Sequence, residues 1–144
     1  MEKVKIAILG FGNVGTGVWK ILHENKKEIM KRSNYEIEVT KILVKDINKK
    51  RDIVVAPGIL TNNIDDIIND ESIKIVVELI GGSSEAKDYM IRAMKAQKHI
   101  VTANKLVIAN WSKELFKVAD AENVLFYYEA SVAGGIPIIR EINE

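Results

Sequence analysis

The spacing of hydrophobic residues alternates along the chain between the period of a strand and that of a helix. Residues 3–9 form a short apolar-rich run that ends at Gly10, which predicts a first strand. From Val14 onward apolar residues recur every three or four positions, so we expect one long helix that continues to about Arg32. The β-branched residues of 36–44 then predict a second strand.

The middle of the chain has a less regular pattern. Residues 45–51 predict a basic loop, and the β-branched residues 53–55 predict a strand-like segment. Pro57-Gly58 predicts a turn. Asn63 can cap the short apolar helix that the following residues predict.

The second half of the chain alternates more clearly. Residues 72–80 form a nearly continuous apolar run, which is typical of a strand in a parallel sheet covered on both faces. The pattern then predicts a helix capped by Ser83 or Ser84 and ending near Gln97, a strand over 99–102, a helix around 111–119 and a last strand over 123–128. Strands that alternate with helices predict βαβ units, and therefore an α/β fold on a parallel sheet.

The segment from Gly10 to Gly15 matches the G-x-G-x-x-G pattern of dinucleotide-binding folds. It directly follows a predicted strand and opens a predicted helix, which is the context that this weak pattern requires. Gly10 permits the tight turn, Gly12 lets the main chain approach a pyrophosphate, and Gly15 allows close packing of helix against strand. The free N–H groups of the helix N-terminus favour an anion at this position.

The residues after the second predicted strand bear on the choice of coenzyme. In dinucleotide-binding domains the usual residue there is an acid that binds the adenosine ribose. In this chain Lys45 could bind a 2′-phosphate, whereas Asp46 could accept a hydrogen bond from a 2′-hydroxyl. The positive charges of Lys49, Lys50 and Arg51 follow closely, so the local field favours NADP over NAD.

Composition narrows the classes of function. The 144 residues fit one domain, and 47% hydrophobic with 28% charged residues is typical of a globular protein. Lys and Arg number 21 against 20 Asp and Glu, a balance that predicts neither a nucleic-acid nor a membrane partner. Cysteine is absent, and His23 and His99 lack companions at metal-ligand spacing, so we expect both histidines to be structural. These features favour a cytoplasmic enzyme or binding module.

Three later segments are more specific than the glycine loop. They are Val76-Val77-Glu78-Leu79-Ile80-Gly81-Gly82, Val101-Thr102-Ala103-Asn104-Lys105, and the run from Tyr128 to Ile139. In their order and spacing, and together with the glycine loop, they resemble homoserine dehydrogenase over essentially the whole chain. The last segment is the most specific of the three, because generic dinucleotide-binding domains lack it.

This resemblance implies a Rossmann-type, doubly wound α/β fold, with a mostly parallel six-stranded sheet in the order 3-2-1-4-5-6 and helices on both faces. It implies a dinucleotide-binding domain over residues 1–136. Residues 137–144 would then begin a hinge helix that leads to a substrate domain absent from this chain. The family interconverts L-homoserine and L-aspartate 4-semialdehyde with NAD(P), in the biosynthesis of threonine, methionine and isoleucine. The chain would then be the coenzyme-binding half of a homo-oligomeric enzyme, and inactive by itself.

The resemblance also implies individual site residues. The positions that match family coenzyme contacts are Phe11, Asn13 and Val14 in the glycine loop, Ile80 and Gly81 after the fourth strand, and Thr102 and Lys105 at the nicotinamide end. Lys105 resembles the family's catalytic lysine between coenzyme and substrate. Ligands bind outside the carboxyl ends of parallel strands, and a partly desolvated lysine there can exchange a proton with a substrate oxygen.

The segment after residue 128 resembles the family's monovalent-cation loop. In that loop the main-chain carbonyls matching Glu129, Val132, Gly134 and Ile136 bind sodium, and the glycines allow the carbonyls to turn inward. A strand-to-helix hinge without an ion is the alternative for this segment.

Two other functions stay open at this point. A stand-alone, non-catalytic dinucleotide-binding or sensing module would need the same glycine loop. A semialdehyde or dihydrodipicolinate-type reductase would share the fold but would not account for residues 129–139. The chain ends at Glu144 inside a predicted helix, which favours a piece of an enzyme, and the reading frame downstream of Glu144 would test this.

Overall fold

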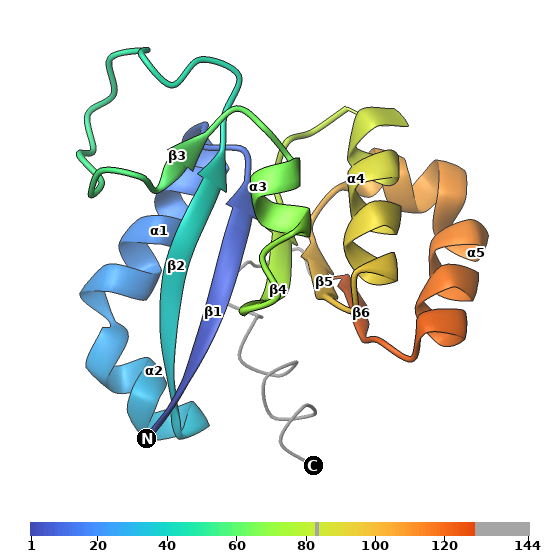
Figure 1. The fold of residues 1–144 in the computed structure, drawn as a ribbon, viewed down its shortest axis with the longest axis horizontal. Helices are drawn as coiled ribbons and strands as arrows, with labels where there is room; N and C mark the ends of the chain where they lie inside the picture. Colours follow the sequence, from blue (N-terminus) through green and yellow to red (C-terminus); the bar gives the residue numbers. More distant parts are fainter. Residues whose placement is uncertain (83, 129–144) are drawn as a thin grey trace.

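A computed structural model of the chain describes residues 1–82 and 84–128. Within these residues six parallel strands form one sheet in the order β3-β2-β1-β4-β5-β6 (Figure 1). The strands are β1 Glu2–Leu9, β2 Tyr35–Leu43, β3 Leu60–Thr61, β4 Ile73–Glu78, β5 His99–Thr102 and β6 Phe126–Tyr128. The strand order expected from the resemblance is therefore confirmed.

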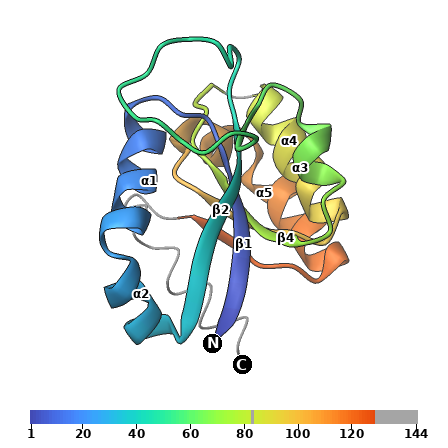
Figure 2. The same ribbon diagram turned by 60° about the vertical axis from the view of Figure 1, so that its left-hand side comes forward.

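Helices cover both faces of this sheet, as Figure 2 shows. On one face lie α1 Asn13–Glu24 and α2 Lys26–Ser33, and on the other lie α3 Asp65–Ile68, α4 Ser84–Lys95 and α5 Lys105–Glu122. Successive side chains of β1 point to opposite faces: Ile8 belongs to the core cluster that contains Val18 of α1, and Leu9 to the one that contains Met90 of α4. The doubly wound α/β fold is thus confirmed.

The long helix expected from residue 14 to about residue 32 is interrupted. α1 ends at Glu24 and α2 begins at Lys26, because Asn25 between them adopts φ −107° and ψ 23°, outside the helical region. The Asn25 N–H still donates to the carbonyl of Ile21, and its carbonyl accepts from the N–H of Ile29, both at 2.9 Å. Asparagine favours helix ends over helix interiors, so the prediction of one uninterrupted helix was wrong for a local reason.

The strand-like segment expected at residues 53–55 is also wrong. These residues lie in the loop 44–59 that connects β2 to β3 (Figure 1), and Val54 is 89% exposed. Ile53 and Val55 are partly buried against the core cluster that contains Val18 of α1, but the segment pairs with no described strand, so its β-branched residues pack without forming one. Hydrogen bonds order the first part of the loop instead: the Arg51 guanidinium donates to the carbonyls of Asp46, at 2.7 Å, and Lys49, at 3.0 Å.

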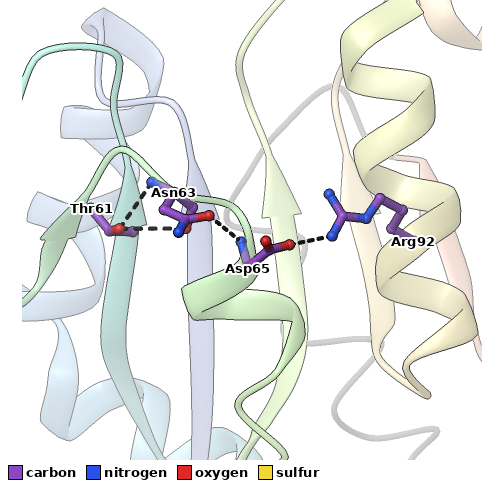
Figure 3. Close-up of polar contacts among 4 residues, drawn as sticks. All are labelled: Thr61, Asn63, Asp65 and Arg92. Atoms are coloured by element: carbon purple, nitrogen blue, oxygen red, sulfur yellow. Dashed lines mark hydrogen bonds and ion pairs between the residues drawn. The ribbon is translucent and has the colours of Figure 1, made fainter.

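Polar contacts fix the connection from β3 to α3 and link α3 to α4 (Figure 3). The Thr61 hydroxyl accepts from the Asn63 N–H at 3.1 Å. The Asn63 Oδ1 accepts from the N–H of Asp65, the first residue of α3, at 3.0 Å, although the N-cap position itself is Ile64, whose side chain makes no capping hydrogen bond. The Asp65 carboxylate in turn pairs with Arg92 of α4. Asn62 lies between two members of this network, which therefore holds its main chain in place.

Both histidines have structural contacts, as expected. The Nδ1 of His99 accepts a hydrogen bond from the Leu125 N–H at 2.9 Å and so links β5 to the segment before β6. Burial, with a smaller contribution from the Lys74 charge, lowers the pKa of His99 below its ordinary value. His23 stacks on Trp19 within α1, with ring centroids 3.8 Å apart.

Candidate functional site

A cleft of about 770 Å³ lies at the carboxyl ends of the central strands. Its walls come from the glycine loop (Gly10, Phe11, Gly12), the end of β2 and the loop after it (Leu43, Val44, Lys45, Asp46, Lys49, Arg51), the segments after β3 and β4 (Asn62, Leu79, Ile80), and α4 (Glu85, Tyr89). Open α/β sheets bind ligands in this position, where the strand order reverses between β1 and β4. The volume suits a small-molecule ligand or cofactor.

The fold requires glycine at two positions of the loop, whether or not a ligand is bound. Gly10 has φ +99°, a conformation that residues with side chains rarely adopt, and a Cβ there would lie 2.9 Å from the Leu79 carbonyl oxygen. A Cβ on Gly15 would lie 2.2 Å from the Gly10 carbonyl oxygen. These contacts confirm the tight turn at Gly10 and the close packing of α1 at Gly15.

Gly12 differs from both, because it faces open space. Apart from its two chain neighbours, no described residue has an atom within 4 Å of the position that a Gly12 Cβ would occupy, although Gly12 lines the cleft. The loop is therefore free at Gly12 for a ligand to approach its main chain.

The N-terminus of α1 fits an anion at the same position. No described side chain caps it, and its first turn contains no acidic residue. The first hydrogen bond within the helix runs from the Thr16 N–H to the Gly12 carbonyl at 2.9 Å, so the N–H groups of Asn13, Val14 and Gly15 lack helical partners. Together with the helix dipole, these groups can bind a pyrophosphate. The residues present thus fit a dinucleotide.

The basic loop contributes charge to the cleft. Lys45 is exposed at the end of β2 and lines the cleft together with Lys49 and Arg51, as the sequence led us to expect. The carboxylate of Asp46 accepts from the Asn48 N–H at 2.9 Å and so stabilises its own turn. Among the described residues no ion pair engages the Lys45 ammonium, so this charge can act on a ligand in the cleft.

The residues expected at the nicotinamide end divide into two groups. Ile80 lines the cleft, and Gly81 follows it with φ +79°. Thr102 is fully buried, however, and its hydroxyl donates to the Glu78 carboxylate at 2.7 Å and accepts from the Asn104 N–H at 3.0 Å. The structure therefore does not bring the Thr102 side chain to the surface of the cleft, because neighbouring polar groups already use it.

Lys105 begins α5, immediately after the strand end. The Oδ1 of Asn104 caps this helix by accepting from the Val107 N–H at 3.1 Å, which fixes the first turn that carries Lys105. Lys105 itself is exposed and does not line the cleft as the described residues form it. The desolvation expected for this lysine is thus not provided by residues 1–82 and 84–128.

Comparison with known proteins settles the family. A family model described as "Homoserine dehydrogenase, NAD binding domain" matches residues 10–129. The chain belongs to the homoserine dehydrogenase family. Membership confirms the resemblance that the glycine loop and the three later segments indicated.

Relatives in the family match the chain along its length. It is 39% identical over 144 residues to the homoserine dehydrogenase of Bacillus subtilis (strain 168), and the aligned region covers 100% of this chain and 33% of that protein. It is 45% identical over 136 residues to the homoserine dehydrogenase of Corynebacterium glutamicum, and the aligned region covers 94% of this chain and 30% of that protein. The chain therefore spans about a third of the length of these relatives.

Solved homoserine dehydrogenases share the fold. The crystal structure of the S. aureus enzyme at pH 7.0 superposes with a TM-score of 0.84 and 40% identity, over 90% of this chain and 33% of that chain. A hyperthermophilic archaeal homoserine dehydrogenase in complex with NADPH has the same fold at a TM-score of 0.67 and 23% identity, over 89% of this chain and 44% of that chain.

Some expected site residues cannot be placed, and others were missed. Glu129, Val132, Gly134 and Ile136, the expected cation ligands, lie outside the described residues. Within the part that the structure describes, no group of three His, Asp or Glu residues is placed to hold a metal ion, and no helix is long and apolar enough to cross a membrane.

Glu78, which the sequence did not single out as a site residue, lies at the end of β4 and is fully buried. A signal for it was present, because it is an acid near the end of an otherwise apolar strand. Tyr89 and Glu85 of α4 were also missed as cleft residues. They reach the cleft only through the packing of α4 on the sheet, and burial with the Glu85 charge raises the pKa of Tyr89.

Proposed function

We propose that this chain is the coenzyme-binding domain of an enzyme that interconverts L-homoserine and L-aspartate 4-semialdehyde with NAD(P). The observation that carries the proposal is the open space at Gly12 beside the uncapped N-terminus of α1, in the cleft where the strand order reverses. Family membership supports the choice of substrate. Because the chain spans about a third of its relatives, the substrate-binding residues belong to the rest of the full-length protein.

The residues of the chain then have distinct tasks. The glycine loop, with Phe11, Asn13 and Val14, holds the pyrophosphate, and Ile80 and Gly81 hold the central part of the coenzyme. The bound coenzyme supplies the hydride acceptor or donor. Lys105 exchanges a proton with the substrate oxygen, as a general acid or base, once the substrate domain has partly desolvated it. Thr102 belongs to the nicotinamide end, where its buried hydroxyl donates to the Glu78 carboxylate.

We further propose that the coenzyme is NADP in preference to NAD. Lys45, Lys49 and Arg51 line one side of the cleft, and a lysine can bind the 2′-phosphate of NADP as a point charge. The Asp46 carboxylate, which would favour the 2′-hydroxyl of NAD, is partly used by the Asn48 N–H. The sodium site at Glu129–Ile136, the homo-oligomeric state and the cytoplasmic location stay predictions.

The test is an activity assay on the full-length protein. We expect homoserine-dependent reduction of NADP, and we expect Lys105→Ala to lower kcat about 10²–10⁴-fold, the usual contribution of general acid–base catalysis. Lys113→Ala is the matched control, since Lys113 is an exposed lysine on the same helix. A full-length protein that binds NADPH but does not oxidise homoserine would instead support the non-catalytic dinucleotide-binding module.

A further inference from the structure

Glu78 is a fully buried carboxylate at the carboxyl end of β4, beside the cleft but not part of its lining. No cation among the described residues forms an ion pair with it. Burying a charge without a partner is costly, so a protein keeps such a group only where its hydrogen bonds compensate. The position of Glu78 between the coenzyme cleft and α5 suggests what those hydrogen bonds are for.

Three donors surround the carboxylate. Its Oε2 accepts from the Ile80 N–H at 2.8 Å and from the Asn104 amide at 3.4 Å, and its Oε1 accepts from the Thr102 hydroxyl at 2.7 Å. An ionised carboxylate is an acceptor only, so it satisfies all three donors together. A glutamine of the same shape would direct an NH₂ group at one of them.

Asn104 carries the same network to both sides. Its amide donates to the Gly82 carbonyl at 3.0 Å, while its Oδ1 caps α5 through the Val107 N–H. Glu78 and Asn104 therefore connect the turn at residues 80–82 to the first turn of α5. Gly81 and Gly82 both have positive φ, and glycines have wide conformational freedom, so the hydrogen bonds from Glu78 and Asn104 help to select this conformation of the turn.

We propose that Glu78 and Asn104 are positioning residues that hold the coenzyme-contacting turn at residues 80–82 in register with Lys105. This inference rests on the proposed function, because it assigns Ile80 and Gly81 to the coenzyme and Lys105 to the substrate oxygen. Neither Glu78 nor Asn104 touches a reacting atom. Their effect is on the distance between the transferred hydride and the group that moves the proton, to which rates are sensitive.

The test compares variants of the full-length protein at a temperature where each remains folded. Glu78→Gln keeps the shape but removes one acceptor, and Asn104→Ser keeps an oxygen able to cap α5 but removes the amide donor to Gly82. Ser33→Ala is the stability control. Ser33 is buried and its hydroxyl donates to the Ile29 carbonyl at 2.7 Å, at the opposite end of the sheet.

We expect both site variants to lower kcat about 10- to 100-fold, by misplacement of the reacting groups. The Kd for NADPH should change much less, and the isotope effect with homoserine deuterated at the reacting carbon should rise as hydride transfer becomes limiting. Ser33→Ala should lower the Tm and leave both kcat and the isotope effect unchanged.

Two results would overturn the proposal, and they can be told apart. If the wild-type protein oxidises homoserine and Lys105→Ala is impaired, but folded Glu78→Gln has a normal kcat and isotope effect, the positioning role alone is wrong. If the wild-type protein binds NADPH without oxidising homoserine, the proposed function is wrong and the positioning role falls with it.

Discussion

Gly12→Val should separate coenzyme binding from folding. The main chain at Gly12 is extended, with φ −82° and ψ −151°, so it lacks the positive φ that would favour glycine. Since no described atom lies within 4 Å of the Cβ position, the substitution introduces no clash there. A poorer N-cap costs about 1 kcal/mol or less, and reduced freedom of the unfolded chain offsets roughly 0.4–1 kcal/mol of it. The free energy of unfolding should therefore change little.

The effect on coenzyme affinity should be much larger. The valine side chain would occupy the space that the pyrophosphate needs at the N-terminus of α1. Each charge-assisted hydrogen bond contributes roughly 1.5–3 kcal/mol, so the loss of two would remove about 3–6 kcal/mol of binding free energy. That range corresponds to a loss of affinity of at least about a hundredfold.

The assay is calorimetric titration with NADPH, accompanied by thermal unfolding of each variant. Gly17→Val is the matched control, because Gly17 lies further along α1 and no described atom outside its neighbours and its own helix main chain lies within 4 Å of its Cβ position. Gly15→Ala is the contrasting variant, since its Cβ would lie 2.2 Å from the Gly10 carbonyl oxygen and should destabilise the fold. The reasoning is refuted if Gly12→Val binds NADPH normally, or if it unfolds as readily as Gly15→Ala.

Two further predictions concern charge and pH. Lys45→Ala should weaken NADPH binding about tenfold or more while NADH binding stays nearly unchanged. The preference of the wild-type chain for NADPH over NADH should shrink as the salt concentration rises. Equal weakening of the binding of both coenzymes in titrations would point to Asp46 as the ribose contact instead. Burial lowers the pKa of His99 below its ordinary 6.5. The unfolded chain therefore binds more protons between the folded pKa and 6.5, and stability should fall as the pH drops through that window. His99→Gln should show a shallower fall of Tm between about pH 7 and pH 5, and equal slopes would exclude His99 as the cause.

The sequence predicts the described strands other than β3, because they have a strong and local signal, whereas the two-residue β3 has none. The apolar runs of β1 and β4 are buried on both faces, and the glycine loop marks where the first strand passes into the first helix. The errors arose where the signal was ambiguous. Asn25, which disfavours a helix interior, interrupts an otherwise regular helical pattern of apolar residues. Residues 53–55 have a strand-like composition but no partner strand.

The candidate site divides in the same way. Gly10 and Gly15 could be found from the sequence because main-chain geometry requires glycine there, and Gly12 because it holds the middle position of the same spacing pattern. The hydrogen-bond network of Glu78, Thr102 and Asn104 could not be found from the sequence, because it joins the end of β4 to the end of β5 and the start of α5, which meet only in the folded protein. For the same reason the sequence did not show that the Thr102 side chain is buried, although it placed this residue at the nicotinamide end.

The most direct test of the account is to titrate NADPH and NADH into the folded chain of residues 1–144. The account predicts saturable binding of one coenzyme per chain, tighter for NADPH, and no homoserine-dependent reduction of NADP, because the chain spans about a third of its relatives. Binding of neither coenzyme, by a chain that circular dichroism shows to be folded, would contradict the assignment of the cleft at the carboxyl ends of β1, β2 and β4.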